Sequence, residues 1–136
     1  MRDDHAVNGL ACFLSIVAHF LTATADRLRG YGALFIATLR DQGGMCLGGV
    51  LAADITTLPD QVRDEVMLFF QQQHGWVANV LREGQLQGEI RKDLDPDAFA
   101  KMFVSGLEGA MMVSRGIKQP QNLDTALETL IQLAKV

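Results

Sequence analysis

The stretch PDQVRDEVMLFFQQQHGWVANVLREGQLQG, from Pro59 to Gly88, is the longest unbroken helical pattern in the sequence. Its apolar residues recur at steps of three, four or seven and form two adjoining rows: Val62, Val66, Phe69, Trp76 and Val80 in one, and Met67, Phe70, Val77 and Leu81 in the other. A helix that is apolar over so wide an arc packs on more than one side. Gln73 and His74 interrupt these rows, and buried polar groups need partners or a cavity. The middle of this helix is therefore the best candidate for a site.

The composition points to one compact helical domain over residues 1–136. Nearly half of the residues are hydrophobic, the three prolines lie between periodic segments, and strand-like alternation is almost absent. The net charge of −4 argues against direct nucleic-acid binding by this chain alone, because holding a phosphate backbone requires clustered Lys and Arg. Cys12 and Cys46 lack CxxC spacing, which favours reduced thiols in a cytoplasm, with a single disulfide as the alternative.

The periodicity predicts six helices, an all-α fold. Their expected ranges are Ala6–Leu21, Ala25–Gln42 (capped by Thr22 or Thr24), Met45–Ile55, Pro59–Gly88, Pro96–Gly116 (capped by Asp95) and a last helix from Asn122 to the C-terminus. The apolar run Leu10–Leu21 faintly resembles a signal peptide, but Asp3 and Asp4 cancel the positive charge that such a peptide needs. The run is also too short to span a bilayer, so we expect no membrane association.

The last two helices carry small and apolar residues in excess of what a six-helix monomer needs to bury. Surfaces of this kind mark contacts with a partner, so we predict a homodimer. The predicted interface comprises Gly106, Gly109, Ala110, Val113, Leu123, Leu127, Leu130 and Ile131.

Motifs for catalysis, metal binding or cofactor binding are not found. The histidines His5, His19 and His74 lie far apart, without HExxH or paired Glu-x-x-His spacing. Nucleophile elbow, Walker loop and dinucleotide glycine patterns are also missing. We therefore expect no enzyme activity, no metal and no cofactor.

Several segments in a fixed order resemble the C-terminal half of tetracycline-repressor-type (TetR/AcrR) transcriptional regulators. These are GGMCLGGVLAADI (residues 43–55), LPDQVRDEVMLFF (58–70) and LREGQLQGEIRKDLDPDAFAKMFVSGLEGAMMVSRG (81–116). The resemblance covers about Leu28 to Val136. The helix-turn-helix that the family carries at its N-terminus has no counterpart in this sequence, so the resemblance implies that DNA binding is supplied by residues outside it.

The resemblance implies a pocket for a small hydrophobic effector, with the last two helices forming a four-helix dimer interface. From the residues themselves, Gln73 and His74 with Phe70 and Val77 fit a mostly apolar pocket, with Met102 and Phe103 opposite. For His74 the alternative is a hydrogen bond in the core or contact with solvent. By family analogy Tyr31, Phe35 and Cys46 join the pocket, with plain core packing as the alternative. Glu108 shares one side of its helix with other polar residues, which favours a solvated edge over binding of a cationic effector.

Two functions from different classes follow. The first is a ligand-sensing, dimerising domain of a transcriptional regulator, whose effector controls the DNA-binding domain. The second is a helical interaction protein that dimerises with itself or a relative and binds no ligand.

Overall fold

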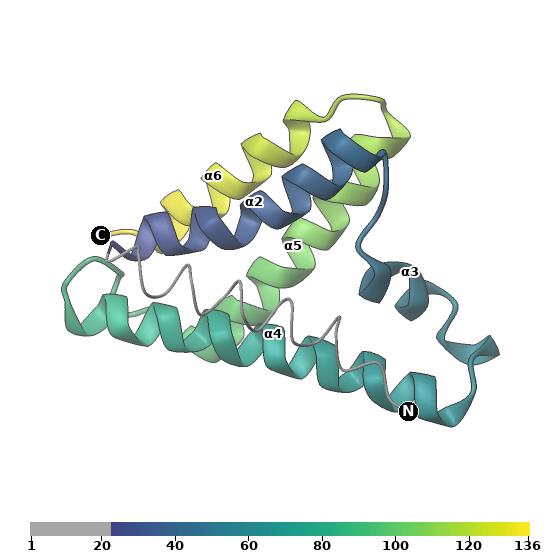
Figure 1. The fold of residues 1–136 in the computed structure, drawn as a ribbon. Coiled ribbons are helices and arrows are strands. Elements are labelled where there is room, and N and C mark those ends of the chain that lie inside the picture. Colours follow the sequence, from purple (N-terminus) through teal and green to yellow (C-terminus); the bar gives the residue numbers. More distant parts are fainter. Residues whose placement is uncertain (1–22) are drawn as a thin grey trace.

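Helices account for most of the chain between residues 23 and 136, which are the residues that the computed structural model describes (Figure 1). The α-helices are α2 (Thr24–Gln42), α3 (Leu47–Ala53), α4 (Asp60–Leu86), α5 (Pro96–Gly116) and α6 (Gln121–Ala134), and a short 3-10 helix covers Ile55–Thr57. The all-α prediction is confirmed. The six-helix count is not, because five α-helices are seen in the described part and the helix predicted over Ala6–Leu21 lies outside it.

Local sequence signals set several helix ends correctly. Asp95 caps α5, since its Oδ1 accepts hydrogen bonds from the backbone N–H of Asp97 at 3.0 Å and of Ala98 at 3.3 Å, and Pro96 occupies the first turn. Gly43 ends α2 in the left-handed conformation, with φ at 58°. The predicted helix over Met45–Ile55 is shorter than expected and becomes α3 followed by the 3-10 turn.

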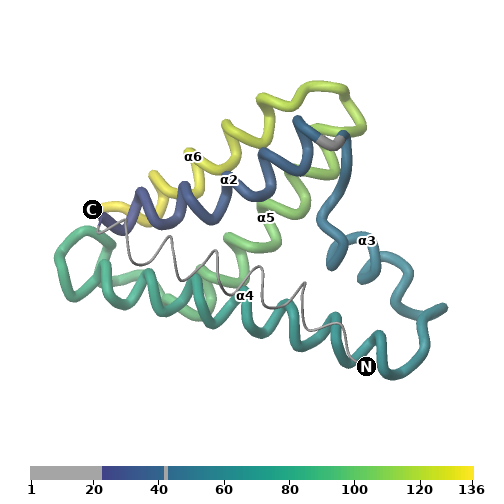
Figure 2. Tube along the Cα trace, in the orientation of Figure 1, coloured from purple at the N-terminus to yellow at the C-terminus, as the bar shows by residue number. Residues whose placement is uncertain are grey.

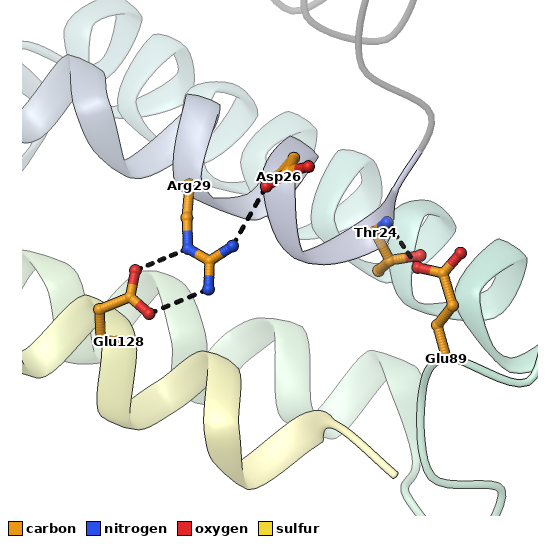
Figure 3. A network of polar contacts seen from close by, with 5 residues as sticks. All are labelled: Thr24, Asp26, Arg29, Glu89 and Glu128. Atoms are coloured by element: carbon orange, nitrogen blue, oxygen red, sulfur yellow. Dashed lines mark hydrogen bonds and ion pairs between the residues drawn. The ribbon is translucent and has the colours of Figure 1, made fainter.

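The start of α2 differs from the prediction. Thr24 does not cap the helix; it is the first helical residue and is buried, and Thr22 lies outside the described residues. The capping acceptor comes instead from Glu89, in the α4–α5 loop, whose Oε2 accepts the Thr24 backbone N–H at 2.7 Å (Figure 3). A carboxylate that bonds to the first N–H groups of a helix also interacts favourably with its dipole. A cap from so distant a residue cannot be read from local spacing.

α2 lies between the other long helices, with contacts to α4, α5 and α6. Figure 1 shows α2 running beside α6, and an ion pair joins the two where Arg29 donates to both carboxylate oxygens of Glu128, at 2.7 and 3.1 Å (Figure 3). The shared core contains Leu28, Tyr31, Val77, Leu81, Phe103, Leu107, Met111, Leu123 and Ile131, all of them buried. α3 stands apart from this core and packs against α4, between the end of α2 and the start of α4 in the tube view (Figure 2).

The segment Glu89–Leu94, between α4 and α5, is held against the C-terminus. The backbone N–H of Arg91 donates to Ala134 O at 3.0 Å, and the N–H of Val136 donates to Glu89 O at 3.2 Å. Ile90 is buried and Leu94 is partly buried. These contacts tie the α4–α5 loop to the C-terminal end of α6, so the loop that supplies the cap of α2 is itself held in place.

Candidate functional site

One stripe of α4 faces a cavity of about 540 Å³. Val62, Val66, Phe69 and Gln73 belong to this stripe, and their spacing of four, three and four residues places them on one side of the helix. α2 and α3 form the remaining walls. The cavity is lined by Tyr31, Leu34, Phe35, Thr38, Met45, Cys46, Leu47, Gly48, Leu51, Val62, Glu65, Val66, Leu68, Phe69, Gln72 and Gln73.

Small residues in α3 allow it to approach the rest of the protein closely. A Cβ atom built on Gly48 would lie 2.5 Å from the Phe69 ring, and one built on Gly49 would overlap Oε2 of Glu108. A side chain at either position therefore requires the Phe69 ring or the Glu108 carboxylate to shift. The two glycines let α3 pack closely on these side chains.

Tyr31 is the centre of an aromatic cluster at the inner wall. Its ring stacks on Trp76 with centroids 5.6 Å apart and an interplanar angle of 19°, and it contacts Phe35 at 5.4 Å and Phe103 at 6.0 Å. The residue is 0% exposed, and its hydroxyl has no hydrogen-bond partner among the described residues. Burial, with Glu108 and Cys46 nearby, raises the pKa of this phenol, so the hydroxyl stays protonated at neutral pH.

Gln73 provides the second unpaired polar group. The side chain is 2% exposed, and Nε2 has no partner within residues 23–136. Buried donors are nearly always paired in folded proteins, so two unpaired donors on one cavity are unusual. Both are available to a molecule that enters the cavity.

The carboxylate of Glu108 is buried beside α3, so the expectation that this side chain is solvated is wrong. Both carboxylate oxygens are buried without a hydrogen-bond partner in the described part of the chain. Burial raises the pKa of this carboxyl, and the Cys46 thiol partly offsets the effect. Burial and Glu108 in turn raise the pKa of Cys46 to about 11, so the thiol is neutral at physiological pH and a poor nucleophile.

The structure brings together some of the residues expected at the site. Tyr31, Phe35, Cys46 and Gln73 line the cavity, whereas Phe70, His74, Val77, Met102 and Phe103 do not. Val77 and Phe103 are in the core and Met102 is exposed on α5. His74 lies toward α5, where burial and the nearby Lys101 lower its pKa. Successive residues of a helix are separated by about 100°, so Gln72 and Gln73 line the cavity while His74 lies toward α5.

Sequence reasoning missed most of the aliphatic lining. The residues added by the structure are Leu34, Thr38, Met45, Leu47, Gly48, Leu51, Val62, Glu65, Val66, Leu68, Phe69 and Gln72. The period of α4 already separates the row of Val62, Val66 and Phe69 from the row of Phe70 and Val77. That signal shows two stripes but does not show which one faces a void.

The residues expected at a dimer interface divide into three groups. Leu123, Leu127 and Ile131 are buried within the chain by α2 and α5, which corrects their assignment to an interface. Gly106, Ala110 and Leu130 are half-buried, and Gly106 packs on Leu130. Gly109 and Val113 are exposed. The outer seam, as we call the exposed or half-buried residues on one side of α5 and α6, comprises Met102, Gly106, Gly109, Val113, Ile117, Ala126, Leu130 and Leu133.

Substitution of Glu108 by glutamine is expected to stabilise the protein increasingly as the pH rises. A raised pKa means that the folded state binds more protons than the unfolded state above the ordinary value of 4.5. Wild-type stability therefore falls as the pH rises from 4.5 through the folded pKa, and Glu108→Gln lacks this loss. The other ionisable groups near it, Cys46 and Tyr31, stay neutral throughout this range.

Urea unfolding at pH 4 and at pH 7.5 measures the effect. The control is Glu65→Gln, which changes an exposed carboxylate and is expected to alter stability by less than about 0.5 kcal/mol. A Glu108→Gln variant no more stable than wild type at pH 7.5 would show that the carboxylate has a favourable partner.

Residues 23–136 contain neither a cluster of metal ligands nor a membrane-spanning helix. The described residues contain no group of three or more His, Cys, Asp and Glu side chains placed to hold a metal ion. None of their helices combines the length and apolar character needed to cross a bilayer. Cys46 is a free thiol, and Cys12 lies outside the described part.

Comparison with known proteins shows similarity to tetracycline-repressor-type regulators over most of the chain. Residues 24–130 match the family model described as tetracyclin repressor-like, C-terminal domain. The HTH-type transcriptional repressor DhaR of Mycobacterium sp. (strain GP1) is 34% identical over 109 residues, which is 78% of this chain and 52% of DhaR. The transcriptional regulator AcuR of Cereibacter sphaeroides is 33% identical over 84 residues, 62% of this chain and 38% of AcuR.

A solved structure shows the same fold. The crystal structure of a TetR-family transcriptional regulator from Agrobacterium tumefaciens aligns with a TM-score of 0.89 and 21% identity, covering 95% of this chain and 68% of that one. The chain spans about half the length of DhaR and less of AcuR.

Proposed function

Because the chain belongs to the family of tetracycline-repressor-like C-terminal domains, we propose that it is the effector-binding and dimerisation domain of a transcriptional regulator that acts in the cytoplasm. DNA binding is then the task of a helix-turn-helix domain outside this sequence. The relatives are regulators by name, which favours regulation over catalysis. The net charge of −4 also favours a domain that does not itself hold DNA.

The cavity beside α4 is the observation that carries this proposal. Its volume of about 540 Å³ falls within the range of small-molecule pockets, and its lining is mostly apolar with a few polar groups. An interaction protein that binds no ligand has no need for such a void, because an empty cavity reduces stability. The cavity therefore favours the sensing domain over the ligand-free alternative.

The outer seam supports dimerisation. Its apolar residues recur along α5 at positions 102, 106, 109, 113 and 117, so they form one continuous stripe beside Leu130 and Leu133 of α6. Gly109 has nothing within 4 Å of a built Cβ, which leaves room for close approach by a partner helix. Two copies that join these stripes about a twofold axis form a four-helix interface.

Effector binding changes the arrangement of the dimer if the two states of the regulator bind the effector with different affinities. The required preference is a difference in binding free energy, and a tenfold difference corresponds to about 1.4 kcal/mol. α4 and α5 are the route of this coupling, because they pack on each other and α4 lines the cavity while α5 carries the seam.

Native mass spectrometry of the untreated protein tests the proposal, since one spectrum gives the subunit count and any retained small molecule. The comparison variant is Leu51→Trp, whose larger side chain fills part of the cavity, with Leu86→Trp at an exposed site as the control. We expect a dimer in all three proteins, and a carried or added ligand in wild type and Leu86→Trp only. Ligand retained equally by a folded Leu51→Trp variant would place the binding site elsewhere.

A further inference from the structure

The cavity has a distinct polar end. Tyr31 Oη and Gln73 Nε2 come from α2 and α4, and both lack a partner among the described residues. Leaving a buried donor without an acceptor costs roughly 1–3 kcal/mol. An acceptor atom within hydrogen-bond distance of both groups would remove both penalties. The phenol keeps its proton and can donate a hydrogen bond to such an atom, because burial raises its pKa.

The charged residues in and near the cavity wall are acidic. Its lining contains no Lys, Arg or His, and Glu65 at the exposed edge of α4 is the one charged residue in it. Behind the wall, Glu108 lies beside Cys46 and Gly49 and places a second carboxyl near Tyr31. An anionic ligand would lose its hydration without meeting a cation, which is costly in an apolar site.

A cationic ligand would also lack a buried partner of opposite charge. Glu108 is not among the residues that line the cavity, and Cys46, which does line it, interacts with the carboxyl from that side. A cation inside the cavity would therefore lack direct contact with the carboxylate. The residues that line the void are mostly apolar, and the polar ones among them are Tyr31, Thr38, Cys46, Glu65, Gln72 and Gln73.

We propose that the effector is an uncharged, largely apolar molecule with one hydrogen-bond acceptor, such as a carbonyl oxygen, which accepts from Tyr31 Oη and Gln73 Nε2. The inference rests on the proposed function, because it names the ligand class of the same cavity. The aliphatic lining contributed by Leu34, Leu51, Val62 and Val66 receives the apolar part of the molecule. Discrimination against anions comes from the acidic surroundings, and discrimination against cations comes from the position of Glu108 behind the cavity wall. Specificity for the acceptor comes from the two donors.

Three probes with the same eight-carbon chain separate the possibilities: 2-octanone, octanoate and octylammonium, at pH 7.5. Trp76 is the one tryptophan of the sequence and stacks on Tyr31, so its fluorescence reports occupation of the polar end. We expect 2-octanone to bind about tenfold more tightly than either ion. Equal or tighter binding of octanoate or octylammonium would overturn the inference.

Variants test the donors directly. Tyr31→Phe removes only the hydroxyl, and Gln73→Leu removes the amide at similar volume. Each is expected to weaken the binding of 2-octanone about five- to tenfold, in line with the loss of one hydrogen bond. His74→Leu is the matched control, because it changes the next residue of α4, which does not line the cavity. Thermal unfolding confirms that each variant is folded. Unchanged affinity in both donor variants would contradict the role of the donors.

Glu108→Gln tests the exclusion of anions. The substitution removes the carboxyl. It is expected to strengthen the binding of octanoate about fivefold and to leave the affinity for 2-octanone unchanged. Asp64→Asn, at an exposed position of α4 that does not line the cavity, is expected to change neither, because water screens its charge. Probes that all bind with equal affinity would contradict this inference alone. Failure of every probe to bind would contradict both the inference and the effector site from which it follows.

Discussion

Replacement of Val113 by aspartate is expected to convert the protein from a dimer into a monomer. Val113 is 52% exposed and lies in the middle of the outer seam. A twofold axis brings the substitution into the interface twice, so two carboxylates are buried without partners. An uncompensated buried charge costs about 3–5 kcal/mol, so the pair weakens association by roughly four orders of magnitude or more.

Light scattering after size-exclusion chromatography at micromolar concentration measures this change. Met112→Asp is the matched control, because the neighbouring residue is similarly exposed, at 57%, but points about 100° away, toward the polar edge of α5 with Lys101 and Arg115. We expect this control to remain dimeric. A Val113→Asp protein that still elutes as a dimer would mean that the seam is not the interface.

Replacement of Phe103 by alanine is expected to remove about 3–5 kcal/mol from the free energy of unfolding. The ring is 0% exposed and lies against Tyr31, with centroids 6.0 Å apart. Truncation loses the transfer free energy of the ring and leaves a void between α2 and α5. Since domains of this size are stable by about 5–15 kcal/mol, the variant should be partly unfolded at physiological temperature.

Urea unfolding at one fixed protein concentration measures this loss, because dimerisation makes stability depend on concentration. Lys101→Ala, an exposed position two residues earlier in α5, is the control and is expected to change stability by less than about 0.5 kcal/mol. A loss below about 1 kcal/mol for Phe103→Ala would show that neighbouring side chains collapse into the space. The sequence had placed Phe103 in the pocket, and this result would distinguish core from lining.

The helices were predictable because their signals are local. Asp95-Pro96 begins α5 at the expected residue, and the apolar period over 59–88 corresponds to α4 at Asp60–Leu86. The cap expected at Thr24 fails because the acceptor comes from Glu89, which is 65 residues away. A contact of that separation has no trace in the spacing of the residues around it.

The candidate site was only partly predictable. Gln73 was singled out correctly as a buried polar residue, because an amide between apolar neighbours in a helix needs a special environment. His74 was included for the same reason, yet it lies on the side of α4 that faces Lys101. Sequence spacing defines relative directions around a helix, but the absolute direction of the cavity depends on where α3 packs.

The sequence by itself determined the all-α class, the course of the long helices and the family, because periodicity, capping residues and ordered motifs are properties of neighbouring residues. Only the tertiary structure decided which apolar stripe is core and which is surface. Leu127 and Val113 are both apolar residues on helical faces, but α2 covers the first, and the second is 52% exposed. Glu108 shows the same limit, since its carboxylate is buried beside α3 while Lys101 and Arg115 on the same side of α5 stay exposed. Burial is a property of the assembled helices, and a single helix does not contain that information.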